Sequence, residues 1–264
     1  MRTIGFINWK GGVGKTTCAT NAAYLMGQIL DAKVLFIDLD KQGNASTWFG
    51  ADTSKGTVSN IFRQGTEAPE VSAIEPMAAR EVIQKTRYSN IDLIASDASL
   101  LDINLALLTN KSGRQDNILI NSLREVSRNY DICLIDNPPD SNITVLNGIE
   151  LADDIIAVTL PNRFSVDGID QLESELENYN EVIGLSAKIR GIVINKFTST
   201  TGTYKIVDYL KSKYQILPHI RTSQITYKRL DDCINQQKSI YELSPRCQYA
   251  RDLKNMISYV VEKW

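Results

Sequence analysis

With 264 residues, of which 43 % are hydrophobic and 23 % charged, the chain has the length and composition of one soluble α/β domain. No apolar run reaches the roughly 20 residues of a membrane span and none resembles a signal peptide, so we expect a cytoplasmic protein. Four cysteines without C-x-x-C spacing and a single histidine argue against a zinc site and predict reduced, buried thiols.

The charge is unevenly distributed along the chain. Residues 1–180 hold 15 Lys and Arg against 24 Asp and Glu, a balance of −9, whereas residues 181–264 hold 14 against 7, a balance of +7. This asymmetry predicts a basic face in the C-terminal third that meets a polyanion. The alternative is an accidental bias on a solvated surface.

In chain order, the first prediction is a strand over residues 3–8, then a glycine-rich loop and a helix over residues 17–30. The loop reads Lys10-Gly11-Gly12-Val13-Gly14-Lys15-Thr16-Thr17. Strand, glycine loop and helix are the context of a phosphate-binding loop, whose backbone N–H groups and helix amino terminus bind polyphosphate. We expect Lys15 to reach the β- and γ-phosphates and the Thr16 hydroxyl to hold Mg²⁺.

This loop departs from the usual G-x-x-x-x-G-K-[ST] pattern. Trp9 stands where glycine is expected, and a second lysine, Lys10, follows it. Two lysines in one short loop repel one another unless phosphate lies between them, so Lys10 is expected to act at the phosphates. A glycine-rich turn with incidental lysines is the alternative.

The second predicted strand, over residues 33–38, ends in Asp38-Leu39-Asp40, followed by the turn Gln42-Gly43-Asn44. Carboxylates at the carboxyl end of a strand project toward the ligand in an open α/β sheet. We predict that Asp40 orients the water that attacks the γ-phosphate, and that Asp38 supports Mg²⁺ or the loop. The alternative is a polar exit from the strand.

Further strands are predicted over residues 91–95, 130–136, 154–160 and 188–195, with a weaker one over 214–217. They are rich in Val, Ile and Leu without alternation, which is typical of parallel strands covered on both faces. Helical spacing lies between them. We therefore predict one domain over residues 1–264 with a doubly wound, mostly parallel sheet and helices on both faces. Residues 50–90 are irregular and are expected to form surface helices and loops beside the nucleotide site.

The strand over residues 130–136 ends in Asp136-Asn137-Pro138-Pro139. Four apolar residues leading into an aspartate are the form of a Walker B strand, whose carboxylate holds Mg²⁺.

These three clusters together resemble the ParA/MinD family of deviant Walker A P-loop ATPases, and most of all its ParA/Soj partition branch. The matching stretches are residues 10–17, 38–44 and 136–139, and the likeness continues through Leu160-Pro161, residues 191–196 and residues 239–243. Asn137 is a departure, because the family usually has threonine or cysteine before the two prolines.

The resemblance implies a Mg²⁺-ATP site and an ATP-dependent homodimer. Lys10 would cross to the partner subunit's nucleotide, Asp40 would orient water and Asp136 would support Mg²⁺. Asn195 and Pro218 would contact adenine. The triphosphate would lie on the loop formed by Gly11, Gly12, Val13, Gly14, Lys15, Thr16 and Thr17.

The resemblance also implies nonspecific DNA binding, nucleoid association and a ParB-like, centromere-binding adaptor. The candidate DNA contacts in the basic third are Arg221, Lys228 and Arg229, with Lys205, Lys211 and Lys213 behind them. Phosphate contacts by Lys and Arg need no base-reading motif, and the chain shows none.

Two other classes stay open on the sequence alone. A MinD-like positioning ATPase would bind membrane through a C-terminal amphipathic helix, and an apolar stripe at residues 253, 256, 257, 260 and 261 superficially fits. Packing of that stripe in the core is the preferred interpretation. A ParA-like positioning factor for a cargo other than DNA would have the same ATP site.

Overall fold

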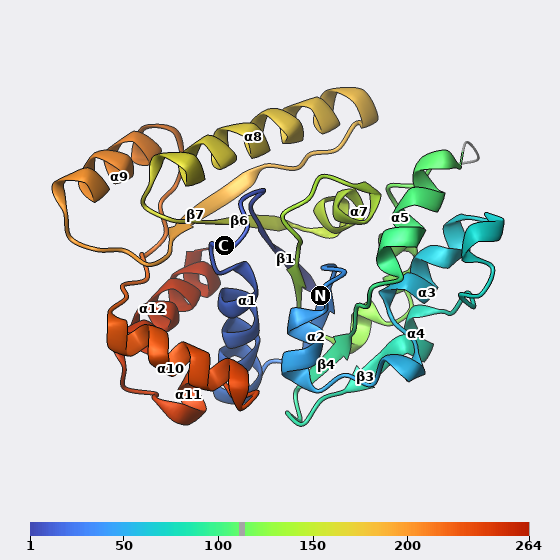
Figure 1. Cartoon of the computed structure of the whole chain (residues 1–264), viewed down its shortest axis with the longest axis horizontal. Helices are drawn as coiled ribbons and strands as arrows, with labels where there is room; N and C mark the ends of the chain where they lie inside the picture. Colours follow the sequence, from blue (N-terminus) through green and yellow to red (C-terminus); the bar gives the residue numbers. More distant parts are fainter. Residues whose placement is uncertain (111–113, 264) are drawn as a thin grey trace.

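A central sheet organises the chain, which a computed structural model describes over residues 1–110 and 114–263 (Figure 1). Within these residues the sheet has seven strands in the order β3-β4-β2-β5-β1-β6-β7. The strands are β1 (Arg2–Ile7), β2 (Val34–Asp38), β3 (Ile83–Lys85), β4 (Ile91–Ile94), β5 (Ile132–Asp136), β6 (Asp154–Thr159) and β7 (Ile189–Ile194). All neighbouring pairs are parallel except β3 and β4.

Helices cover both faces of the sheet, as the predicted doubly wound fold requires (Figure 1). They are α1 (Lys15–Tyr24), α2 (Asn44–Phe49), α3 (Val58–Phe62), α4 (Ala79–Val82), α5 (Leu100–Thr109), α6 (Ile118–Leu123), α7 (Ile143–Leu151), α8 (Arg163–Ile183), α9 (Thr201–Lys213), α10 (Gln224–Asn235), α11 (Ile240–Leu243) and α12 (Gln248–Lys263). A π-helical segment, Leu25–Ile29, continues α1.

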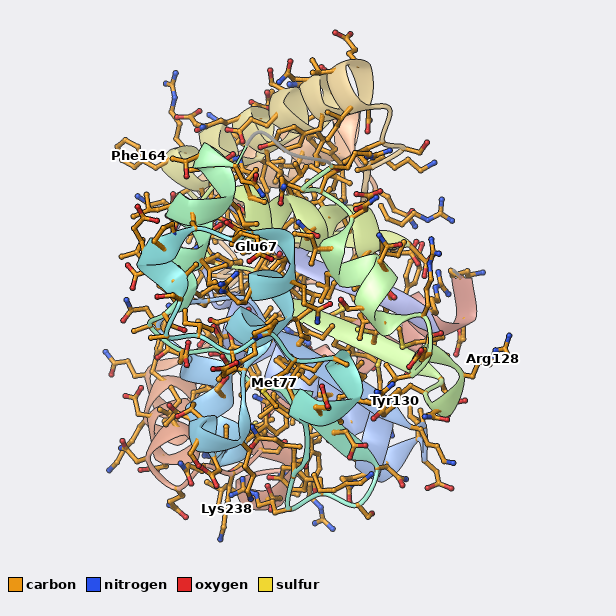
Figure 2. The ribbon with its side chains drawn as sticks, turned by 90° about the vertical axis from the view of Figure 1, so that its right-hand side faces the viewer. Glu67, Met77, Arg128, Tyr130, Phe164 and Lys238 are labelled. Atoms are coloured by element: carbon orange, nitrogen blue, oxygen red, sulfur yellow. The ribbon has the colours of Figure 1, made fainter. Side chains whose placement is uncertain are left out.

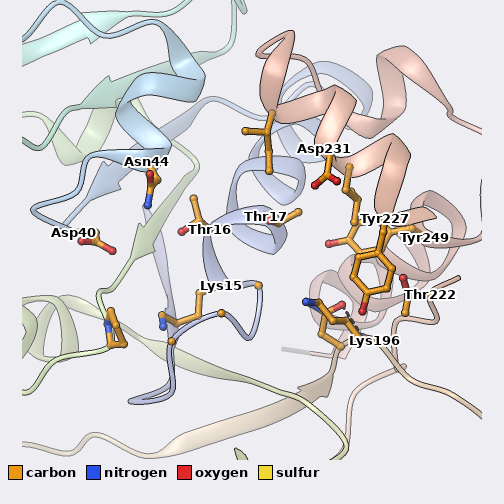
Figure 3. Close-up of a pocket in the computed structure, with 17 residues that line it drawn as sticks. Lys15, Thr16, Thr17, Asp40, Asn44, Lys196, Thr222, Tyr227, Asp231 and Tyr249 are labelled. Atoms are coloured by element: carbon orange, nitrogen blue, oxygen red, sulfur yellow. Dashed lines mark hydrogen bonds between the residues drawn. The ribbon is translucent and has the colours of Figure 1, made fainter. Parts of the chain in front are cut away.

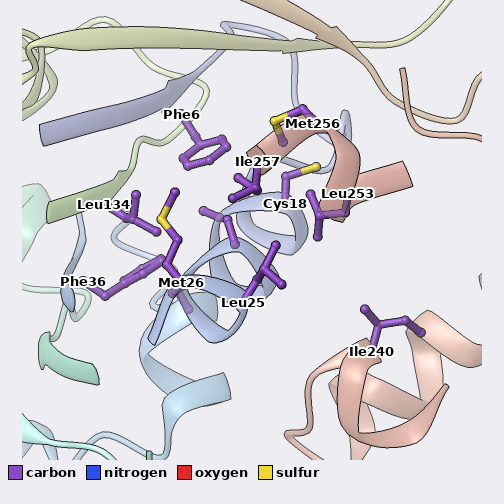
Figure 4. Packing of buried hydrophobic residues seen from close by; sticks show 14 of the residues in the cluster. Phe6, Cys18, Leu25, Met26, Phe36, Leu134, Ile240, Leu253, Met256 and Ile257 are labelled. Atoms are coloured by element: carbon purple, nitrogen blue, oxygen red, sulfur yellow. The ribbon is translucent and has the colours of Figure 1, made fainter. Parts of the chain in front are cut away.

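The two faces of each strand pack in different clusters, which explains the continuous apolar runs. On β1, Phe6 lies in the cluster with α1, α11 and α12, whereas Ile7 lies in the cluster with α7, α8 and α9. On β2, Phe36 faces the first cluster, and its neighbour Leu35 packs with α3, α5 and α6. Figure 4 shows the first cluster, with Phe6, Phe36 and Leu134 of the sheet facing the helices.

The six principal predicted strands are confirmed to within two residues. Two smaller elements differ from expectation. No sequence pattern indicates β3, a three-residue antiparallel edge strand, and residues 214–217 form only an isolated bridge between Ile192 and Ile216. The four cysteines are free and buried, as expected.

The expectation for residues 50–90 is wrong in one respect. They do form short helices and loops, but none of them lines the nucleotide cleft described below. Val58, Ile61, Phe62 and Val82 are fully buried against β2 and β4 instead. Figure 2 looks onto this side of the molecule, where Met77 lies in the segment.

The C-terminal stripe packs in the core. Leu253, Met256, Ile257 and Val260 of α12 are buried beside α1, as Figure 4 shows for the first three, whereas Val261 is half exposed. The apolar face needed for membrane binding is therefore already covered at four of its five positions. No helix in the described part of the chain is long and apolar enough to cross a membrane.

Candidate nucleotide-binding site

A cleft of about 350 Å³ opens at the carboxyl ends of the parallel strands (Figure 3). The loops that follow β1, β2, β5 and β7 reach it, and α10 forms its far wall. Its lining includes Gly11, Gly12, Gly14, Lys15, Thr16, Thr17, Asp40, Asn44, Pro139, Asn195, Lys196, Thr222, Tyr227 and Asp231. The structure thus brings together the three motifs that the sequence separates by up to about 130 residues.

The glycine loop depends on two left-handed glycines, Gly12 (φ +74°) and Gly14 (φ +95°). Gly14 precedes α1, and its carbonyl accepts from Cys18 N–H at 2.9 Å. A Cβ on Gly14 would collide with Nδ2 of Asn195, which donates to the carbonyl of Val13 at 2.8 Å. The loop is therefore clamped against the end of β7.

Gly14→Ala is expected to destabilise the fold by about 2–4 kcal/mol, because the left-handed backbone disfavours Cβ and Asn195 must move as well. Gly12→Ala is the matched control, since its φ is also positive but nothing lies within 4 Å of the added Cβ. Urea denaturation of both variants checks this, and an equal loss of unfolding free energy would show that the clamp contributes nothing.

Asn8 shapes the loop and was missed in the sequence. It is fully buried, donates from Nδ2 to the carbonyl of Val158 at 2.8 Å, and accepts at Oδ1 from Lys10 N–H at 2.8 Å. Its own carbonyl accepts from Lys15 Nζ at 3.0 Å. The only available signal was an amide placed between an apolar strand and the glycine loop.

The two loop lysines have opposite environments. Lys15 is buried, and its Nζ also donates to the carbonyl of Lys10 at 3.3 Å. Burial lowers the pKa of Lys15, while the carboxylates of Asp136 and Asp40 act in the opposite direction. Lys10 is exposed and lies against Gly168 of α8. Lys15 is thus built into its own site, and Lys10 faces outward.

Asp38 and Asp40 differ in what their carboxylates contact. Asp38 is fully buried, and it accepts from Asp40 N–H at 3.0 Å and from Ser46 N–H and Oγ at 2.8 and 2.7 Å. Burial raises the pKa of Asp38 to about 6, and these hydrogen bonds oppose the rise. Of its two predicted roles, the contacts favour support of the loop over support of Mg²⁺. Asp40 lines the cleft, and its Oδ1 accepts from Gln42 N–H at 2.9 Å.

Asp136 has the environment of a metal-supporting carboxylate. Both of its oxygens are buried without a hydrogen bond of good geometry to any described residue. Burial raises the pKa of Asp136 well above its ordinary value and the adjacent Asp38 adds to this, while the nearby Thr16 hydroxyl and Lys15 ammonium lower it. A buried, unpartnered carboxylate beside a threonine hydroxyl fits a hard divalent cation.

No set of three acidic, histidine or cysteine side chains gathers into a metal site within the described ranges. A Mg²⁺-nucleotide site does not require such a set, because Mg²⁺ is commonly held by one or two protein groups together with phosphate oxygens and water.

The wall of the cleft opposite Asp40 comes from the end of β7 and from α10. Asn195 lines the cleft, and its contact with adenine stays a prediction, whereas Pro218 is not among the residues that line the cleft. Tyr227 and Asp231, on one side of α10, were not identified in the sequence, because nothing in the local pattern shows which face of that helix meets the loop.

The predicted DNA contacts fall into two groups. Arg221 pairs with Asp252 of α12, donating from Nε and Nη2 at 3.0 and 2.7 Å, while its side chain stays half exposed, and its contact with DNA stays a prediction. Lys228 and Arg229 are exposed on α10. The lysines expected behind them lie on α9, where Lys213 pairs with Asp170.

Comparison with known proteins places the chain in a family. Residues 1–189 match a family model described as an AAA domain. The chromosome partitioning protein ParA of Caulobacter vibrioides is 32 % identical over 203 residues, which cover 75 % of this chain and 70 % of that protein. The chain belongs to the ParA family of ATPases.

Two further likenesses span nearly the whole of this ParA-family chain. The virulence plasmid ParA family protein pGP5-D of Chlamydia psittaci is 28 % identical, with 100 % of this chain and 95 % of that protein covered. The structure of a Cyanothece McdA variant in complex with ATP superposes with a TM-score of 0.83 at 23 % identity, over 99 % of this chain and 95 % of the other. At 23 % identity, the likeness to the McdA variant shows a shared fold alone.

Proposed function

We propose that this ParA-family protein is a DNA-partition ATPase that cycles between an ATP-bound dimer and a released form. MgATP binding joins two copies face to face, and the dimer binds DNA nonspecifically and so associates with the nucleoid in the cytoplasm. A ParB-like, centromere-binding adaptor then stimulates slow hydrolysis of ATP to ADP and phosphate, which releases the DNA.

The observation that carries the proposal is the separation of the two lysines. Lys15 is buried and hydrogen-bonded within its own loop, so it serves the nucleotide of its own subunit. Lys10 lies on the same loop but is exposed. A cation presented outward from a phosphate site is suited to a triphosphate in a second copy, in the way that an arginine finger acts between proteins.

The cleft holds the groups that hydrolysis requires. Thr16 and Asp136 would hold Mg²⁺, which neutralises charge on the β- and γ-phosphates when bound. Asp40 lines the cleft on the same side as Asn44 in Figure 3, where a water molecule would be oriented for attack on the γ-phosphate. The backbone turn that carries Asp40 is held by the hydrogen bonds that Asp38 accepts from Asp40 N–H and Ser46 N–H.

Helix α10 connects ATP binding with DNA binding, since one side of the helix lines the cleft and another side is exposed to solvent. Leu230 and Ile234 line the cleft, whereas Lys228 and Arg229 are exposed. A nucleotide in the cleft therefore contacts the same helix that carries the basic residues, which supports an ATP-dependent DNA surface.

Lys228→Glu combined with Arg229→Glu is expected to weaken ATP-dependent retention on nonspecific DNA strongly. Wild-type retention should need ATP rather than ADP and should fall steeply with salt, because phosphate contacts release counterions. The slope of log K against log salt should decrease by about one for each phosphate contact removed. Retention on immobilised DNA across a salt series measures this.

Arg128→Glu with Lys188→Glu is the matched control. It makes the same change of charge at two exposed residues. These residues lie next to the amino ends of β5 and β7, at the edge of the sheet opposite the cleft. Figure 2 shows Arg128 projecting into solvent near the amino end of β5. If both double variants lose retention equally, the DNA surface is not on α10. If wild type is retained equally with ATP and ADP, the proposed switch is wrong.

A further inference from the structure

The cleft has two chemically different ends, and the orientation of a bound nucleotide follows from them. Asp40 and Asn44 lie at one end, Lys15 and Thr16 in the middle, and Thr17 toward α10, as Figure 3 shows. If the γ-phosphate lies beside Asp40, the nucleoside extends past Thr17 toward α10. This step rests on the proposed function.

Polar side chains of α10 and of the segment before it line this end of the cleft. No described residue forms a hydrogen bond or ion pair with Asp231, although its side chain lines the cleft and lies on the Thr17 side of α10 in Figure 3. The buried hydroxyl of Thr222 lines the same end, close to the hydroxyl of Tyr227. Tyr227 lies between them, with Lys196 Nζ 5.0 Å from the centre of its ring.

A carboxylate at this position is unsuited to contact the triphosphate, which it would repel. It is suited to accept hydrogen bonds from neutral hydroxyl groups, and the two adjacent hydroxyls of a ribose match the two oxygens of a carboxylate. Hydrogen bonds from hydroxyl donors to a charged acceptor are stronger than those between neutral groups.

We propose that Asp231 recognises the ribose hydroxyls of the bound nucleotide and gives the site its preference for ribonucleotides. Tyr227 closes the same end of the cleft, and its ring provides an apolar surface for the nucleoside. The proposal assigns nucleoside recognition to α10, in addition to the predicted contact of Asn195 with adenine.

The test compares the affinities of ATP and 2′,3′-dideoxy-ATP by titration calorimetry in the presence of Mg²⁺. Wild type is expected to bind ATP about tenfold more tightly or better, the ratio expected from losing hydrogen bonds to a charged group. Asp231→Ala should lower the affinity for ATP until the two nucleotides bind equally. Asp231→Asn, which keeps one acceptor oxygen, should retain part of the preference.

Asp232→Ala is the matched control, because Asp232 is the exposed next residue of α10 and does not line the cleft. It should preserve the wild-type ratio. Equal affinity of wild type for both nucleotides, or an unchanged ratio in Asp231→Ala, would overturn the assignment while leaving the ATPase proposal intact. Failure of wild type to bind either nucleotide would instead overturn the proposed function.

Discussion

Replacing Lys10 with alanine is expected to leave MgATP binding within about threefold of wild type and to abolish the ATP-dependent dimer. The exposed Lys10 side chain makes no hydrogen bond with a described residue, so its removal should not disturb the loop. A cation supplied across an interface to a phosphoryl-transfer site is worth about 10³–10⁵ in rate. Adaptor-stimulated hydrolysis should therefore fall at least a thousandfold.

Lys15→Ala provides the contrast for Lys10→Ala. Because Lys15 is buried and donates to the carbonyls of Asn8 and Lys10, its loss should impair nucleotide binding itself. Calorimetry for binding, sedimentation for the dimer and phosphate release for turnover separate the two variants. Stimulated turnover at the wild-type rate in Lys10→Ala would contradict the role of Lys10 across the interface.

Asp40→Ala is expected to trap the ATP-bound dimer, because nucleotide binding and dimerisation should persist while hydrolysis falls by about 10²–10⁴, the range for loss of a group that positions or activates water. The trapped dimer should stay on DNA after the adaptor is added. Phosphate release and the rate of dissociation from DNA measure the two effects.

Asp140→Ala tests whether charge alone explains the effect of Asp40→Ala. Asp140 also acts electrostatically on Lys15 and pairs with Lys41 at 3.7 Å, but it is not among the residues that line the cleft. It should retain most of the wild-type turnover. Wild-type turnover in Asp40→Ala, or an equal loss in both variants, would refute a specific role for Asp40.

The parts of the site that were predictable from sequence are those in which a backbone conformation or a strand end determines position. The phosphate loop needs its glycines at φ values that other residues avoid, and carboxylates at the ends of parallel strands necessarily meet at one edge of the sheet. Asp38 and Asp136 are indeed neighbours in the register of β2 and β5.

The parts that were missed depend on partners far away in the chain. Whether Arg221 is a free cation or half of an ion pair is decided by Asp252, which lies 31 residues later. Whether Asp38 points at a metal or at the loop depends on Ser46. The orientation of α10 places Asp231 in the cleft, and helical periodicity cannot reveal this when both sides of the helix carry polar residues.

Sedimentation velocity of the Asp40→Ala protein tests the central claim most directly, because hydrolysis cannot consume the nucleotide during the run. With MgATP the protein should sediment at twice the monomer mass of 29.5 kDa, and with ADP or without nucleotide it should sediment as a monomer. Adding Lys10→Ala to the same protein should restore the monomer in MgATP. A monomer under every condition, or a dimer that is indifferent to nucleotide and to Lys10, would contradict the account.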